Sequence, residues 1–269
     1  MDAFDRTPLM YAAAAAQSEA VEFLVNARAS LDHRDAEGMT PLIHAAGGRR
    51  RLLEVSQGSM SSIRCLLSAQ AEVNIASLQG CTALSLACRS GSPAAASMLL
   101  RRKASPNQEV GDSLSPLAVA AQQGHAKIIS LLLEGTANPN MADADGETAI
   151  MVASAAGREA VVEKLIGGGA DVKACMQDGG TALLFVVEEY ADKRLAKDVA
   201  SAVVKRLIEM EADPIAATMD GRTPLKTAAR GPQSAWLEDV LYTAAAANKT
   251  KNTSCCDCIA GFRIMFASQ

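Results

Sequence analysis

The sequence is poor in aromatic residues and in histidine, and it carries no excess of basic charge. Aromatic residues make up only 3% of the 269 residues while hydrophobic residues make up 49%, so a buried core must consist mainly of aliphatic side chains. Three histidines leave little material for histidine-based catalysis or a zinc cluster. The net charge of −4 argues against a protein that binds duplex nucleic acid, because such binding needs a basic surface.

Long hydrophobic runs are also missing. The sequence predicts no transmembrane helix, because no run of about 18 apolar residues is free of charge. Asp2 and Asp5 stand where a signal peptide carries positive charge, which argues against secretion. The seven cysteines are therefore expected to be reduced thiols, and the expected location is the cytoplasm, with the nucleus as the alternative.

Common catalytic motifs are not found. The sequence contains no phosphate-binding, dinucleotide-binding, zinc-protease or serine-hydrolase motif. His33, Arg34 and Asp35 match a kinase triplet, but Thr40 occupies the position of the required Asn. Residues 143–146 resemble the start of a calcium loop whose glycine comes two residues too early, so they are predicted to form a turn. We expect a protein that is not an enzyme, with no catalytic, cofactor-binding or metal-binding residues and no cofactor.

A short motif recurs along the chain instead. It consists of Thr or Ser, then Pro or Ala, then Leu or Ile, and its copies begin at Thr7, Thr40, Thr82, Ser115, Thr148, Thr181 and Thr223. Successive copies lie 33 residues apart, or 42 where nine residues are added. The first six copies are each followed by a helical pattern, an apolar pair and a short polar end. Seven copies in phase indicate a repeat protein.

Elementary helix rules explain the residues of one repeat. The Thr or Ser caps the first helix by accepting a backbone N–H, and Pro at the next position costs no hydrogen bond. Pairs of Ala keep this helix thin, and Gly91, Gly124 and Gly157 are predicted to end it. The second helix carries apolar residues three or four apart, as at Ile128 and Leu132. Because one helix pair cannot bury its own apolar face, stability must come from the stacking of neighbouring repeats.

At these residues the chain resembles the ankyrin-repeat family, which has a period of 33 residues and a Thr-Pro-Leu-His core. The resemblance covers roughly residues 2–242 and implies an all-α solenoid of stacked helix-turn-helix units with β-turn or hairpin connections. No copy has His three residues after its first residue, and His44 lies one position later, so the family's hydrogen bond between His and Thr is expected to be missing. The repeats are expected near residues 2–34, 35–76, 77–109, 110–142, 143–175, 176–217 and 218–242, and a polar, cysteine-containing, poorly ordered tail is expected over 243–269.

Two repeats carry nine additional residues between their helices. The inserts span residues 47–60 and 188–201, and each suits one added turn on each helix plus a longer loop. Leu195, Val199 and Val203 lie four apart, so the second helix of the sixth repeat is expected to begin early. The inserts are interpreted either as tolerated surface insertions or as contact sites.

The resemblance implies a non-catalytic scaffold or adaptor, a monomer that binds another protein along its concave face. Tip and helix-end residues expected to contact this partner are Glu37, Met39, Leu78, Gln79, Arg89, Ser90, Asp112, Leu114, Gln122, Gln123, Ala144, Asp145, Glu147, Asp178, Met219, Asp220 and Arg222. Asp and Glu at several tips favour a partner with basic residues. Met39, Leu78, Leu114 and Met219 are expected to form an exposed apolar stripe. The alternative is the substrate-recognition arm of a larger enzyme, such as a kinase, ubiquitin ligase or acyltransferase, whose catalytic part is missing from this chain.

The cysteines fall into two groups. Cys65 and Cys88 are predicted to be small core residues. Cys255, Cys256 and Cys258 form a cluster in the tail, and three interpretations stay open: inert thiols, sites of lipidation that would attach the chain to a membrane, and metal or redox ligands.

Two basic runs and the single tryptophan complete the inventory. Residues 49–51 and 101–103 are either solvated charges near helix ends or a surface that steers an acidic partner. Trp236 is expected to pack the last helix pair as a cap, with a contact to a partner as the alternative.

Overall fold

The computed structural model describes residues 2–47, 57–108, 114–229 and 235–251. Within these residues it contains helices and no strand, which confirms the predicted all-α class. The helices are α1 (Pro8–Ala14), α2 (Ser18–Asn26), α3 (Pro41–Gly47), α4 (Gln57–Ser68), α5 (Ala83–Arg89), α6 (Pro93–Arg101), α7 (Pro116–Gln123), α8 (Ala126–Glu134), α9 (Ala149–Ala155), α10 (Glu159–Gly167), α11 (Ala182–Ala191), α12 (Lys197–Glu209), α13 (Pro224–Ala228) and α14 (Ala235–Lys251).

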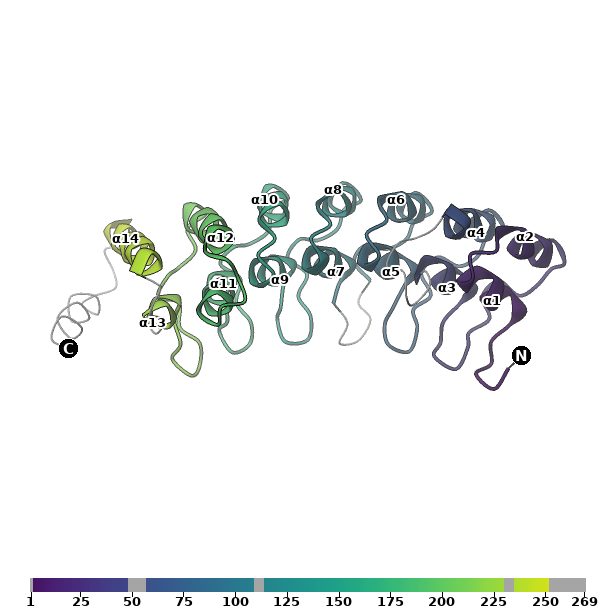
Figure 1. Cartoon of the computed structure of the whole chain (residues 1–269), viewed down its shortest axis with the longest axis horizontal. Helices are drawn as coiled ribbons and strands as arrows, with labels where there is room; N and C mark the ends of the chain where they lie inside the picture. Colours follow the sequence, from purple (N-terminus) through teal and green to yellow (C-terminus); the bar gives the residue numbers. More distant parts are fainter. Residues whose placement is uncertain (1, 48–56, 109–113, 230–234, 252–269) are drawn as a thin grey trace.

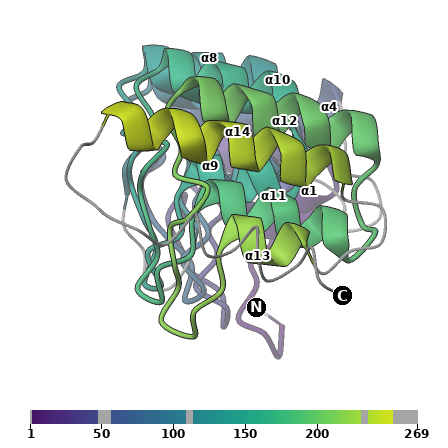
Figure 2. The same cartoon turned by 90° about the vertical axis from the view of Figure 1, so that its left-hand side faces the viewer.

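The helices form two parallel rows along an elongated solenoid (Figure 1). Each odd-numbered helix packs against the next odd-numbered helix, and each even-numbered helix against the next even-numbered one. Figure 2 shows loops projecting from the odd row, on the side away from the even row. We call these loops fingers: finger 1 (2–7), finger 2 (32–40), finger 3 (74–82), finger 5 (140–148), finger 6 (173–181) and finger 7 (215–223). Finger 4 (107–115) lies partly outside the described residues.

One continuous aliphatic core lies between the two rows. It consists mainly of Ala, Leu, Val and Ile side chains from every repeat. Ala120 and Ala121 of α7 are completely buried, which lets neighbouring helices of the odd row approach closely. Cys88 is buried in this core and Cys65 packs against it, as predicted.

Helix caps follow the predicted pattern in all but one repeat. The side-chain oxygens of Thr7, Thr40, Thr82, Ser115, Thr181 and Thr223 each accept the backbone N–H three residues further on. The prediction is wrong at Thr148, whose buried hydroxyl makes no hydrogen bond. The N–H of Met151 donates to the carbonyl oxygen of Thr148 instead, at 3.1 Å. The predicted glycine ends are confirmed at Gly91, Gly124 and Gly157, whose φ angles are 69°, 82° and 64°.

The insert of the sixth repeat lengthens both of its helices. α11 and α12 have 10 and 13 residues, whereas α9 and α10 have 7 and 9. Leu195 and Val199, in the insert, lie so close to Gly157 that a Cβ there would be 2.7 Å from each side chain. The second insert therefore packs on the fifth repeat, while residues 48–56 of the first insert lie outside the described residues.

The C-terminal helix is longer than the repeat pattern indicates. α14 continues to Lys251, past the predicted boundary at residue 242. The Trp236 ring meets the Tyr190 ring edge-on, with ring centres 5.5 Å apart, and its Nε1 donates to the Tyr190 hydroxyl at 3.0 Å. Trp236 thus packs the last helix pair onto α11, as predicted.

Candidate functional site

Short polar side chains close fingers 2, 3 and 5 locally. In finger 2, Asp35 Oδ1 accepts the backbone N–H groups of Glu37 and Met39, at 3.0 and 2.8 Å. Ser77 in finger 3 and Asp143 in finger 5 make the equivalent pairs of bonds. Such side-chain turns define where the tip residues lie, without help from a partner.

The carboxylate of Asp35 also ties finger 2 to its surroundings. His44 Nε2 lies 2.8 Å from Asp35 Oδ2 in a hydrogen bond, and Arg6 Nε of finger 1 lies 3.6 Å from the same oxygen. Although burial opposes ionisation, hydrogen bonds from Met39 N–H and His44 hold the pKa of Asp35 below its ordinary value. The carboxylate is almost completely buried, so it stabilises the repeat and is not available to a partner.

Backbone hydrogen bonds join neighbouring fingers at their tips. In fingers 2 and 3, the N–H of Leu78 donates to the carbonyl oxygen of Glu37 at 2.9 Å. In fingers 6 and 7, the N–H of Met219 donates to the carbonyl oxygen of Asp178 at 2.7 Å. The N–H groups of Ala36 and Gln177 bond in the same way to the carbonyl oxygens of Phe4 and Asp145. Each joined pair of tips therefore has a fixed spacing.

The structure exposes most of the residues expected to bind a partner. Exposed side chains are Glu37, Leu78, Gln79, Arg89, Gln122, Gln123, Ala144, Asp145, Asp178, Met219 and Asp220. Half-buried side chains are Met39, Ser90, Leu114, Glu147 and Arg222. Asp112 lies outside the described residues. Arg89 and Ser90 lie at the C-terminal end of α5, Gln122 and Gln123 lie at that of α7, and the other residues lie in the fingers.

The predicted apolar stripe is wrong at two of its four positions. Leu78 and Met219 are 75% and 86% exposed, but Met39 and Leu114 pack against the core. Met39 and Leu114 each directly precede a capping residue. At this position the finger returns to the odd row, so the side chains of Met39 and Leu114 turn inward. The two exposed members of the predicted stripe therefore belong to fingers 3 and 7 and do not form a continuous stripe.

Finger 5 carries an acidic cluster that consists of Asp143, Asp145 and Glu147. Among the described residues, no Lys, Arg or His lies within ion-pair distance of these three carboxylates. Partial burial, together with the charges of Asp143 and Asp145, raises the pKa of Glu147. The three carboxylates give finger 5 a negative electrostatic potential, and a basic side chain of a partner would reduce the repulsion between them.

Finger 7 has a balanced charge, unlike finger 5. The guanidinium of Arg222 pairs with Glu188 of α11 at 2.5 Å, with Asp220 at 2.7 Å and with Asp178 of finger 6 at 3.6 Å. Hydrogen bonds from the Thr218 hydroxyl and from Arg222 lower the pKa of Asp220. Sequence reasoning missed this network, because only Arg6 and Arg222 are basic residues directly before a capping residue, so the network leaves no signal that recurs in every repeat.

Sequence reasoning also missed a second contact between neighbouring repeats. It lies where the chain passes from each even-numbered helix to the next finger. Asn107 Nδ2 donates to the carbonyl oxygen of Thr136 at 2.9 Å, and its Oδ1 accepts the N–H of Asn138 at 2.7 Å. Asn74 and Asn140 make the same two bonds to the repeats that follow them. The signal was present in the sequence as an Asn recurring at one position of the repeat.

Two other kinds of site are missing from the part of the chain that the structure describes. In it, no group of three His, Cys, Asp or Glu side chains is placed to hold a metal ion. No helix in that part combines the length and hydrophobicity needed to cross a membrane. Cys255, Cys256 and Cys258 lie outside the described residues, so their interpretations stay open.

Comparisons with known proteins agree on the architecture. A family model described as ankyrin repeats (3 copies) matches residues 1–55 and 104–176, and one described as ankyrin repeat matches residues 79–109. The crystal structure of the human ASB11 ankyrin repeat domain is 26% identical, with a TM-score of 0.72, covering 89% of this chain and 98% of that one. The ankyrin repeat domain of Bcl-3, described as a unique member of the IkappaB protein family, is 27% identical, with a TM-score of 0.67, covering 88% and 98%. A comparison with curated proteins finds no match.

Proposed function

The chain belongs to the ankyrin-repeat family, whose domains are generally protein–protein interaction modules, and we propose that it binds a partner protein along its fingers as a non-catalytic scaffold. Binding is by surface complementarity on a preformed frame, because the tips are already held by side-chain turns and by bonds between fingers. The exposed ends of α5 and α7 extend the proposed surface beyond the fingers.

The observation that carries this proposal is the acidic cluster of finger 5 within a row of exposed tips. The cluster lacks a basic counterpart among the described residues, whereas the carboxylates around Arg222 in finger 7 are paired. A partner with Lys or Arg opposite finger 5 satisfies the cluster, and apolar side chains opposite fingers 3 and 7 cover Leu78 and Met219.

The test removes the charge of finger 5 without changing its shape. In the triple variant Asp143→Asn, Asp145→Asn and Glu147→Gln, each amide keeps an oxygen where the carboxylate had one, so Asn at position 143 can still accept the two turn bonds. Proteins captured from native extract by the wild type and by this variant are quantified by mass spectrometry. We expect the finger variant to lose a partner that the wild type retains.

The matched control removes three carboxylates from the even row. Glu134, Glu159 and Glu163 are exposed on α8 and α10, so their change to Gln alters the net charge by the same amount. The control is expected to retain the partner. Capture of the same proteins by the finger variant, or equal loss in both variants, contradicts the proposed surface.

A further inference from the structure

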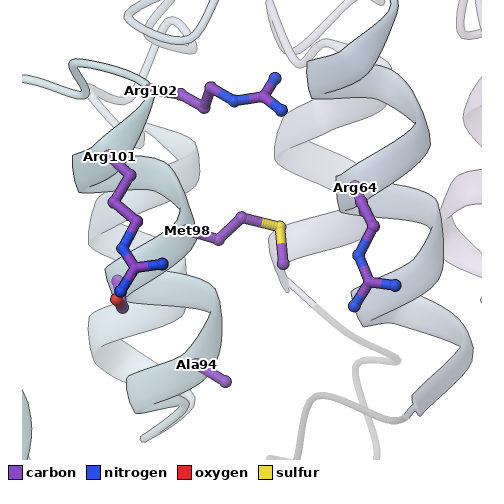
Figure 3. A pocket seen from close by; sticks show the side chains of 6 residues that line it. Arg64, Ala94, Met98, Arg101 and Arg102 are labelled. Atoms are coloured by element: carbon purple, nitrogen blue, oxygen red, sulfur yellow. The ribbon is translucent and has the colours of Figure 1, made fainter.

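A basic groove lies in the even row, away from the fingers. It runs between α4 and α6 and has a volume of about 380 Å³. Arg64 of α4 lines one side, and Ala94, Ser97, Met98 and Arg101 of α6 line the other, together with Arg102 directly after α6. Figure 3 shows Met98 and Arg102 reaching from α6 toward α4, with Arg64 on the facing helix.

The three arginines surround an apolar floor. Arg64 and Arg101 are exposed, and no carboxylate among the described residues lies within ion-pair distance of them. Arg102 donates to the carbonyl oxygen of Leu67, which holds its guanidinium near α4. Met98, between the helices, packs partly against the core. The groove therefore offers, at its rim, arginines without an ion-pair partner among the described residues, and the thioether side chain of Met98 lies between them.

The fold does not require arginine at these positions. At the equivalent place between α8 and α10, Ser130 stands at the position of Arg64, and Gly167 and Gly168 stand at those of Arg101 and Arg102. Lys164 replaces Met98 there, and its Nζ donates to the Ser130 hydroxyl at 2.8 Å, which bridges the two helices. The same backbone geometry thus exists with and without the basic rim.

We propose that the groove between α4 and α6 binds an acidic peptide segment of a partner protein. The planar guanidinium groups of Arg64 and Arg101 bind carboxylates through paired N–H donors, and the flexible side chain of Met98 receives an apolar residue of the peptide. The chain as a whole has a net charge of −4, so the attraction for an acidic segment is local and comes from the arginines of this groove. Because the even row faces away from the fingers, the groove and the fingers can be occupied together (Figure 1).

The test uses the full chain and a fluorescein-labelled peptide that contains Glu-Glu-Leu-Glu-Glu. Fluorescence anisotropy measures its affinity for the wild type and for the double variant Arg64→Glu, Arg101→Glu. We expect the peptide to bind the wild type with an affinity that falls as the salt concentration rises. In the double variant we expect the affinity to fall by at least about tenfold, because charge reversal turns attraction into repulsion. The wild type is expected to bind a peptide with Gln in place of Glu no more tightly than the double variant binds the glutamate peptide.

The matched control is Lys127→Glu, Lys205→Glu. These exposed lysines lie on α8 and α12 of the same row, so the control changes the net charge equally outside the groove. It is expected to bind the glutamate peptide within about twofold of the wild type, after a small loss from the changed overall field. Equal loss in both double variants overturns the proposal, as does full affinity in Arg64→Glu, Arg101→Glu.

A second measurement locates the peptide without a charge change. In protein labelled with ¹³C-methyl methionine, the Met98 methyl resonance, assigned with Met98→Leu, is expected to shift when the glutamate peptide is added. The absence of peptide binding to the wild type, or of a Met98 shift on binding, overturns the proposal. Binding to phosphatidylserine vesicles in place of the peptide also overturns it and assigns the groove to a membrane surface instead.

Discussion

The central and C-terminal repeats are joined to their neighbours by different kinds of contact. From the second repeat to the fifth, the side chains of Asn74, Asn107 and Asn140 each bond to two backbone groups of the next repeat. At the same position, the fifth and sixth repeats have Lys173 and Ile215. Lys173 reaches the following repeat through an exposed ion pair with Glu211, at 3.2 Å.

The C-terminal repeats rely on contacts between particular side chains. Arg222 joins finger 7 to α11 through Glu188, and Trp236 joins α14 to α11 through Tyr190. A bond to the backbone can recur in every repeat, because each repeat presents the same carbonyl and N–H. A contact between two side chains needs both partners, so it occurs once and leaves no periodic signal.

The largest effect is expected from the aromatic contact at the C-terminal end. Trp236→Ala removes the ring packed on Tyr190 and is expected to destabilise the last helix pair by about 3 kcal/mol. Because repeat proteins unfold in local units, hydrogen exchange of α13 and α14 amides should accelerate far more than that of α7 and α8. Trp236→Phe keeps an aromatic ring and is expected to lose only about 1 kcal/mol. A uniform change along the chain contradicts the separate stability of this end.

Breaking one asparagine contact tests the central repeats. Asn107→Ala removes two hydrogen bonds between repeats and is expected to lower the free energy of unfolding by about 1–2 kcal/mol, measured by urea titration. Asn138 is the control, since its Oδ1 accepts only the N–H of Asn140 in its own turn. Asn138→Ala should cost about 0.5 kcal/mol, and an equal cost for both variants rules out a special role of the contact between repeats.

The missing asparagine contact can be introduced in the fifth repeat. Lys173→Asn places the amide where Asn74, Asn107 and Asn140 stand in their repeats, next to the backbone of Glu211 and Asp213. We expect the free energy of unfolding to rise by about 1 kcal/mol, since the exposed ion pair that is lost contributes little. Lys173→Ala serves as the reference, because it removes the ion pair and adds nothing. Equal stability of the two variants shows that the asparagine position is specific to the central repeats.

The smallest effect concerns the charge difference between fingers 5 and 7. The pKa of Glu147 is raised in the folded protein, so its ionised form is destabilising, and the stability it contributes at acid pH is lost as the pH rises through the folded pKa. Glu147→Gln is therefore expected to stabilise the protein at neutral pH and to have no effect below the ordinary carboxyl pKa. Asp220 has a lowered pKa, so Asp220→Asn is expected to destabilise at neutral pH and to lose that effect in acid. Urea titrations at neutral pH and below the ordinary carboxyl pKa measure the change in the free energy of unfolding for each variant. A change of the same sign in both variants at neutral pH contradicts the difference between the two fingers.

Local patterns predicted much of the fold and part of the candidate site. The caps at Thr82 and Ser115 and the helix end at Gly124 were predictable, because each depends on residues within one turn of helix. Thr148 has the same sequence signal but makes no cap bond, so the signal alone does not decide the geometry. Met39 was expected at the surface, since the repeat pattern places it in a finger but does not show which way its side chain points.

The repeat, its period and its pairs of helices could be read from the amino-acid order, because they arise from contacts between residues close together in the chain. Which side chains of different repeats meet depends instead on how the repeats stack. Arg64 and Arg101 lie in different repeats and belong to unrelated local patterns, yet they line one groove. Arg222 likewise reaches Glu188 only because the seventh repeat stacks on the sixth. The distance and angle between stacked helices set these contacts, and those depend on the packing of the whole core.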